Sequence, residues 1–198
     1  MEFREILARR RMHRAFEPTP IPRDQIERVV GVIRRSPSGG FSQGSSIVVV
    51  TDEAKRAEFA ELFADHQPTQ RFVAQAPVHL VLSANESLYH ARYNEPDKLA
   101  ITGGVEVTWP VPYWFVDAGA LMMLVLAAAI DEGLAAAFVG HPDQNRLFSE
   151  LVELPDEVVP IGLALVGRPA PDPTAEHGTS RMRERRRPRG DLIHWERW

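Results

Sequence analysis

Arg10-Arg11-Met12-His13-Arg14-Ala15-Phe16 is the segment that says most about the architecture of this chain. It places three arginines within five residues, directly after a helix predicted from the spacing of its apolar residues. About two dozen residues later, residues 36–44 read Ser-Pro-Ser-Gly-Gly-Phe-Ser-Gln-Gly, a turn rich in hydroxyl, amide and backbone N–H groups. Arginine side chains bind phosphate, and a glycine turn lets the backbone approach a flat ring. Together the two segments predict a site for a phosphorylated, planar ligand such as flavin mononucleotide (FMN).

Length, composition and charge set the broad class of this protein. The chain has 198 residues, of which 44% are apolar and 25% charged, as in an ordinary globular domain. Its net charge of −4 argues against a protein built to coat nucleic acid. The absence of cysteine excludes disulfides, thiolate catalysis and cysteine-ligated metals, and it fits the cytoplasmic location that we predict.

The pattern of apolar residues predicts one sheet covered by helices on both faces. Strands are predicted at 47–50, 78–83, 135–139 and 160–166, and residues 192–195 are a candidate for a last short strand. The most apolar segment, residues 118–130, spans about 20 Å as a helix, which is short of the ~30 Å needed to cross a bilayer. We therefore predict that it forms part of a core helix at 115–134, and we expect no membrane association.

The long loop predicted at residues 94–114 contains Trp109 and Tyr113 and ends at Trp114. Loops of this length within a compact domain are often functional. One interpretation makes these aromatic residues a wall over a flat ligand, and the other makes them packing residues in the core of a dimer.

The chain has no evident catalytic motif of its own. It contains no P-loop, no G-x-G-x-x-G after a strand, no G-x-S-x-G and no H-E-x-x-H. Its seven histidines show no metal-binding spacing. We therefore expect no metal and no catalytic side chain, with a bound cofactor carrying the chemistry.

Five segments, in order, resemble signatures of the nitroreductase family. Residues 10–16 resemble its R-R-S-V-R-x-F signature, residues 37–43 its P-S-x-x-N-x-Q signature, and residues 117–134 its central-helix pattern. Residues 154–169 resemble its L-P…G-x-P block, and residues 194–198 resemble the end of the family. Each motif is weak alone, but five in order over nearly the whole chain are specific. The loop P-S-G-G-F-S-Q-G suggests an actinobacterial-type variant.

The resemblance implies an α+β fold of three layers, with a central mixed β-sheet of four to five strands flanked by helices. It implies that residues 1–180 form the FMN-binding domain and that residues 181–198 form a basic tail wrapped around the partner subunit of a homodimer. The implied activity is that of an FMN-dependent oxidoreductase. It would transfer electrons from NADH or NADPH, by a ping-pong cycle, to a small flat acceptor such as a nitroaromatic, quinone, enone or flavin.

The resemblance also implies which residues line the site. The arginines of residues 10–14 and one arginine of the tail would hold the phosphate, and the backbone at residues 138–140 would approach the flavin ring. The loop at residues 38–43 would serve the partner's site. The expected cofactor-binding residues are Arg10, Arg11, Met12, His13, Arg14, Ser38, Gln43, Phe138, Val139, Gly140, Arg186 and Arg187. The expected substrate-pocket residues are Phe41, Trp109, Tyr113 and Trp114.

Three departures from the family pattern leave the substrate open. Met12 stands where the family usually has serine, Phe41 stands where it usually has asparagine, and Gly44-Ser45 stands where it usually has Pro-Trp. A flavin-dependent dehydrogenase, a dehalogenase or a deazaflavin-linked reductase on the same fold is therefore an alternative. An alternative of another class is a flavin-binding protein without turnover.

The charged segments also have simpler interpretations. The arginines of residues 10–14 can be a solvated helix end. The tail, with seven arginines in residues 181–198, can be a nucleic-acid arm, although it lacks the aromatic or glycine-rich spacing of RNA-binding segments. We therefore expect a small-molecule acceptor and a second copy of the chain as partners, and no nucleic acid.

Overall fold

The computed structural model describes residues 1–171, 182 and 184–198. The predicted boundary between the domain at residues 1–180 and the tail at residues 181–198 lies outside the described residues. Within them, the chain forms a five-stranded sheet with the order β1-β5-β3-β2, in which β4 also pairs with β5. The strands are β1 (Phe16–Glu17), β2 (Ser45–Val50), β3 (Val78–Asn85), β4 (Ala135–Val139) and β5 (Val158–Pro169).

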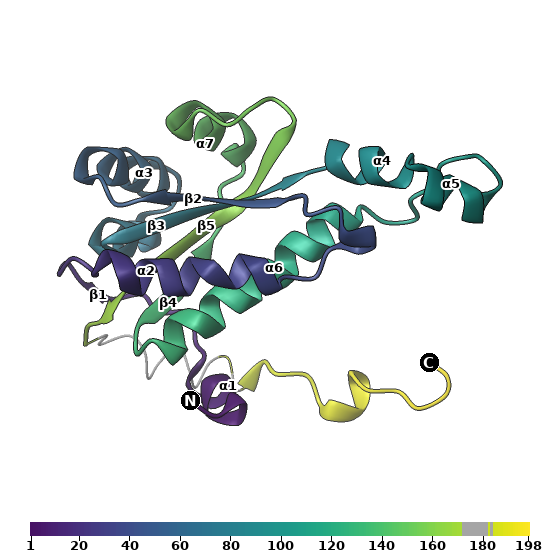
Figure 1. The fold of residues 1–198 in the computed structure, drawn as a ribbon. Helices are drawn as coiled ribbons and strands as arrows, with labels where there is room; N and C mark the ends of the chain where they lie inside the picture. The colour runs from purple at the N-terminus through teal and green to yellow at the C-terminus, as the bar shows by residue number, and fades with distance from the viewer. Residues whose placement is uncertain (172–181, 183) are drawn as a thin grey trace.

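Helices cover the sheet on both faces, so the α+β class and the three layers predicted from the sequence are confirmed. Figure 1 shows α3 and α7 over one face, α2 and α6 over the other, and α4 with α5 projecting beyond the end of the sheet. The α-helices are α1 (Phe3–Arg9), α2 (Arg23–Val30), α3 (Glu53–His66), α4 (Ser87–Tyr93), α5 (Pro96–Thr102), α6 (Tyr113–Asp131) and α7 (Gln144–Val152). Short 3₁₀ helices are η1 (Gly31–Arg35), η2 (Gly39–Phe41), η3 (Pro68–Gln75) and η4 (Arg189–Asp191).

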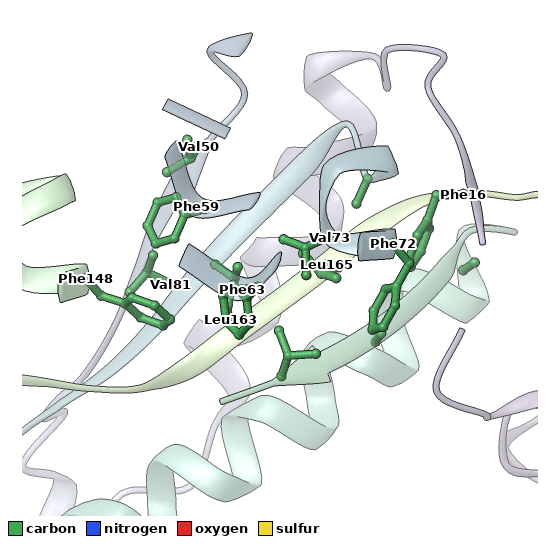
Figure 2. Packing of buried hydrophobic residues seen from close by; sticks show 14 residues of the cluster. Phe16, Val50, Phe59, Phe63, Phe72, Val73, Val81, Phe148, Leu163 and Leu165 are labelled. Carbon is green, nitrogen blue, oxygen red and sulfur yellow. The ribbon is translucent and has the colours of Figure 1, made fainter. Parts of the chain in front are cut away.

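The strands are apolar on both faces because helices bury both. Leu163 and Leu165 of β5 point to one core and Ala164 and Val166 to the other, as the two-residue period of a strand requires. The first core is aromatic, with rings from α3, α7 and η3 packed on the sheet (Figure 2). Each ring buried in this way stabilises the fold by roughly 1.5–3 kcal/mol.

The second core is built on α6. Leu121, Val125 and Ala129 recur at helical spacing and are fully buried against the sheet. By length and composition alone α6 could cross a membrane, but here one face of it packs on the sheet. The prediction of a core helix is confirmed, although α6 begins two residues earlier and ends three residues earlier than predicted.

Four other expectations need correction. The sheet is not mixed, since every strand pairing in the described chain is antiparallel. Residues 192–195 do not form a strand within this chain. The loop predicted at 94–114 contains α5, which has proline at its start and a left-handed glycine after its end. The strand β1 was missed because two residues give no periodic signal.

Candidate functional site

The arginines of residues 10–14 follow the last turn of α1 and are at least partly exposed. Arg11 and Arg14 are exposed and Arg10 is half-buried. Over the described part of the chain, none of the three is in an ion pair with a carboxylate, whereas Arg9 pairs with Glu5 at 2.6 Å. A cluster of cations without acidic partners favours an external anion such as phosphate.

This cationic segment, residues 10–14, lies along the outer edge of β4. The backbone N–H of His13 donates to the carbonyl of Ala136 at 3.1 Å, and the exposed Met12 lies beside it in the sequence. Backbone groups alternate between the two edges of a strand, so those of Phe138 point to the same edge as those of Ala136. Gly140, just past the end of β4, is exposed. The structure therefore brings the segment at 10–14 close to the strand that leads into the backbone at 138–140, as predicted. Within 138–140, the side chain of Val139 is buried.

The 3₁₀ helix η3 contacts the residue that follows Ala15 and also carries an unpartnered polar atom. The N–H of Phe16 donates to the side-chain oxygen of Gln75 at 3.1 Å, which ties the end of the cationic segment to η3. On the same helix, Oε1 of Gln70 is buried and has no hydrogen-bond partner among the described residues. Buried amide groups without partners are uncommon. Arginines that have no carboxylate partner among the described residues, beside the edge of β4, fit a ligand that carries a phosphate, as FMN does.

The loop at residues 38–43 has a closed internal geometry. The N–H of Gln43 donates to the hydroxyl of Ser38 at 2.6 Å, and the hydroxyl of Ser42 donates to the carbonyl of Gly39 at 2.7 Å. Phe41 is 75% exposed at the tip. The Ser38 hydroxyl therefore holds the backbone at Gln43, and Phe41 and Gln43 are the exposed residues within 38–43.

A buried carboxylate anchors this loop to the helices α6 and α4. Oδ2 of Asp117, on α6, accepts the N–H of Gly39 at 2.8 Å and the hydroxyl of Tyr89 at 2.6 Å. Burial, followed by the neighbouring carboxylate, raises the pKa of Tyr89 far above its usual range, so that its hydroxyl stays protonated and donates.

The loop and the cationic segment lie at opposite ends of the sheet in one copy of the chain. His13 bonds to Ala136, whose partner on β5 is Val166. Gly44, which closes the loop, bonds to the last residue of β3, whose partner on β5 is Val158. Eight residues of strand separate the two positions, or about 26 Å. A single copy therefore does not bring these two predicted halves of the site together.

The predicted aromatic residues fall into two groups. Trp109 lies at the centre of an aromatic cluster. Its ring centroid is 4.6 Å from that of Tyr93 and about 6 Å from those of four other rings. Its indole N–H donates to Glu106 at 3.0 Å. Trp114 is buried within the same cluster. Tyr113 is 40% exposed. Of the four predicted pocket residues, Phe41 and Tyr113 are therefore the two with substantial exposed surface.

The tail arginines are not placed at the site within one copy. Arg186 and Arg187 are exposed, and Arg187 donates to the carbonyl of Asp191 at 2.7 Å. Figure 1 shows the end of the chain extending away from the body of the domain. In the described residues no hydrogen bond or ion pair joins these arginines to residues 10–14.

The sequence reasoning missed Tyr89 and Arg92, which contact the loop, and the role of Asp117. A signal for Asp117 was present, because a carboxylate inside an apolar helix is rarely buried without a partner. For Tyr89 and Arg92 no sequence signal existed, since both lie on an ordinary short helix. No group of three or more metal-ligating side chains occurs among the residues described, so nothing in them suggests a metal site.

Comparisons with known proteins identify relatives of the whole domain. The nitroreductase family matches residues 7–168. An FMN reductase [NAD(P)H] of Bacillus subtilis is 29% identical over 160 residues, covering 79% of this chain and 61% of the relative. An oxygen-insensitive NADPH nitroreductase of Salmonella typhimurium is 28% identical over 170 residues, covering 85% of this chain and 66% of the relative. The matched regions thus span less than two thirds of the length of either relative.

Solved structures show the same fold. A nitroreductase family protein from Streptococcus pneumoniae superposes with a TM-score of 0.74 at 20% identity, covering 99% of this chain and 100% of the other. A protein of Exiguobacterium sibiricum, solved in complex with FMN, gives a TM-score of 0.73 at 18% identity, covering 99% of this chain and 98% of the other.

Proposed function

This chain belongs to the nitroreductase family, and from that premise we propose that it is an FMN-dependent oxidoreductase that uses NADH or NADPH to reduce a small flat acceptor. The observation that carries the proposal is the cluster of arginines at residues 10–14, which have no carboxylate partner among the described residues and lie beside the edge of β4. The relatives described as an FMN reductase and a nitroreductase support the same class of reaction.

The chain's own residues bind and orient the cofactor in this proposal. Arg10, Arg11 and Arg14 hold the phosphate and the ribityl side, each hydrogen bond to charge contributing about 1.5–3 kcal/mol. The backbone groups of Phe138 and Gly140 face the ring from the edge of β4. Bound FMN supplies the capacity to accept and donate a hydride, and no acid–base side chain is needed beside it.

We propose that the site is completed by a second copy of the chain. The loop at residues 38–43 lies about 26 Å from the cationic segment, so the partner's loop is the one that meets it. Apolar side chains that such a contact would cover are exposed: Val116 and Met123 lie two turns apart on the same face of α6, and Phe3 and Leu7 lie on α1. In the same way, we propose that the tail arginines, including Arg186 and Arg187, contact the flavin site of the second copy.

Nitroaromatics, quinones, enones and flavins share the flat, conjugated shape that an aromatic wall favours. Phe41 and Tyr113 are proposed to form that wall. The proposed location is the cytoplasm, where reduced nicotinamide and cysteine-free proteins are both ordinary.

The test is the visible spectrum of the purified protein with its stoichiometry of FMN. We expect an oxidised-flavin spectrum that is bleached anaerobically by NADH or NADPH and restored by a quinone. Arg10→Ala is expected to remove most of the flavin. Arg9→Ala is the matched control, because Arg9 is adjacent but already paired with Glu5. A colourless wild-type protein after incubation with FMN, or an Arg10→Ala variant with full flavin content, contradicts the assignment.

The same experiment separates the alternatives. In a deazaflavin-linked reductase, the bound flavin would stay oxidised with NADH and NADPH, and its spectrum would be bleached by a reduced deazaflavin. A non-catalytic flavin-binding protein would bind FMN tightly and be reduced by none of the three.

A further inference from the structure

The loop at residues 38–43 holds an unusual backbone conformation. Gly40, Phe41 and Gln43 have φ of 57°, 63° and 55°, in the left-handed region. For a residue other than glycine this conformation costs roughly 1–2 kcal/mol. Such conformations persist where the surrounding structure holds them, and they gather at binding sites. The contacts that hold this loop therefore bear on what it does.

Most of these contacts come from one face of α4. Tyr89, Arg92 and Tyr93 follow the i, i+3, i+4 spacing that places side chains on the same side of a helix. A Cβ added at Gly40 would lie 2.7 Å from the ring of Tyr93, and one added at Gly44 would lie 2.5 Å from the ring of Tyr89. The rings of Tyr93 and Tyr89 therefore pack closely against the loop backbone, at positions where only glycine fits.

Arg92 makes a side-chain hydrogen bond to the peptide group that links Gly40 to Phe41. Its Nε donates to the carbonyl of Gly40 at 2.9 Å, one peptide before Phe41. Its two terminal nitrogens donate to the two oxygens of Asp97 at 2.7 and 2.8 Å, and Nη1 also donates to Glu95 at 2.9 Å. A guanidinium held by two parallel bonds has a fixed orientation. Arg92 therefore connects the start of α5 rigidly to the peptide that carries Phe41.

We propose that Arg92 is a positioning residue for acceptor selectivity, which fixes the ring of Phe41 as a wall against the flavin site of a second copy. This inference rests on the function proposed above. Without the bond to the Gly40 carbonyl, the Gly40–Phe41 peptide keeps only the bond from its N–H to the carbonyl of Ser38, at 2.9 Å, and the ring is held less firmly in place. An acceptor that stacks on the ring is then bound less well, while an acceptor that does not stack is unaffected.

The test compares the FMN-loaded wild type with Arg92→Gln and Arg92→Lys, using menadione as the stacking acceptor and ferricyanide as the one that does not stack. Arg92→Gln is expected to raise KM for menadione about tenfold, the effect of losing one aromatic contact, with little change for ferricyanide. For Arg92→Lys, we expect a KM for menadione between that of the wild type and that of Arg92→Gln. Arg28→Gln is the matched control, because Arg28 also bridges two carboxylates, Asp24 and Glu132, but lies on α2.

A double-mutant cycle with Phe41→Ala identifies the route of the effect. If Arg92 acts through Phe41, then Arg92→Gln changes nothing further in the Phe41→Ala background. Equal losses with both acceptors, or an undiminished effect of Arg92→Gln after removal of the Phe41 ring, would overturn the proposal.

A readout without turnover keeps this inference separate from the proposed function. With 4-fluorophenylalanine at position 41, we expect one sharp fluorine NMR resonance in the wild-type background and a broadened or split one in Arg92→Gln. Identical resonances in the two proteins would refute the positioning role. Absence of turnover in the wild type would instead refute the proposed function.

Discussion

The hydroxyl of Tyr89 and the main-chain N–H of Gly39 share one oxygen of Asp117, at 2.6 and 2.8 Å. The carboxylate is buried, so these two donors compensate for its removal from water. Because Tyr89 lies on α4, Gly39 in the loop and Asp117 on α6, this one oxygen joins three segments that are distant in sequence.

Tyr89→Phe should therefore destabilise the protein by about 1.5–3 kcal/mol, because it leaves a buried charge with one donor fewer. Chemical denaturation measures this difference as a change in the free energy of unfolding. Tyr113→Phe is the control, since Tyr113 is 40% exposed and its hydroxyl has no hydrogen-bond partner among the described residues, and it should change stability by less than about 0.5 kcal/mol. Equal stabilities for Tyr89→Phe and wild type would mean that the shared oxygen contributes nothing.

Gly162→Ala tests how closely β5 approaches the end of β4. A Cβ at this position would lie 2.4 Å from the ring of Phe138 and 2.9 Å from the carbonyl of Val139, with φ at 150°. We expect a loss of roughly 1–3 kcal/mol and, because the backbone at 138–140 must shift, a lower affinity for FMN.

Gly31→Ala is the comparison for this substitution. Nothing lies within 4 Å of a Cβ there and φ is an ordinary −59°, so it should be neutral or stabilising by up to about 1 kcal/mol. If both alanine variants have the same thermal stability, the contacts around Gly162 do not disfavour a Cβ at that position.

His79 should make the fold sensitive to acid. It is fully buried with Nε2 3.0 Å from the carbonyl of Val73, and burial lowers its pKa from 6.5 to about 4. The unfolded chain takes up this proton at a higher pH than the folded chain does. Stability from the neutral histidine is therefore present above pH 6.5 and is lost as the pH falls from 6.5 to about 4, by about 3 kcal/mol.

His79→Leu removes this ionisable group and should flatten the fall in stability over that pH range. It should lower stability at neutral pH, since the carbonyl of Val73 keeps only its longer bond, from the N–H of Ala76 at 3.4 Å. The quantity to compare is the slope of the unfolding free energy against pH. The same slope in both proteins would show that His79 does not titrate in the folded state as described.

Subunit complementation tests the shared site. Arg10→Ala removes a cation from residues 10–14. Gly40→Val disrupts the loop, because its side chain would clash with the ring of Tyr93 and because φ is positive there. Each variant alone should be inactive. If each site combines residues 10–14 of one copy with residues 38–43 of the other, random mixing should restore activity in about a quarter of the sites. Mixing that restores nothing, with heterodimers verified by two tags, would mean that both halves of a site come from one chain.

The sequence anticipated the layers and the central strands because these depend on local periodicity. β2, β3, β4 and β5 are runs of β-branched or small apolar residues, and α6 is an unbroken apolar helix. It did not anticipate α5, because Pro96 and Gly103 also fit a loop. The direction of the strand pairings was not accessible, since a strand reads the same whether its neighbour is parallel or antiparallel.

By itself the sequence determined the fold class, the family and the candidate segments at residues 10–16 and 37–44, because residue types and spacing along the chain carry that information. Only the tertiary structure decided which candidates meet. It placed His13 on the edge of β4, moved the loop to the far end of the sheet, and assigned Trp109 to packing. Asp117 and Arg92 became anchors of the loop for the same reason: their partners are fixed by long-range packing, which no local pattern encodes.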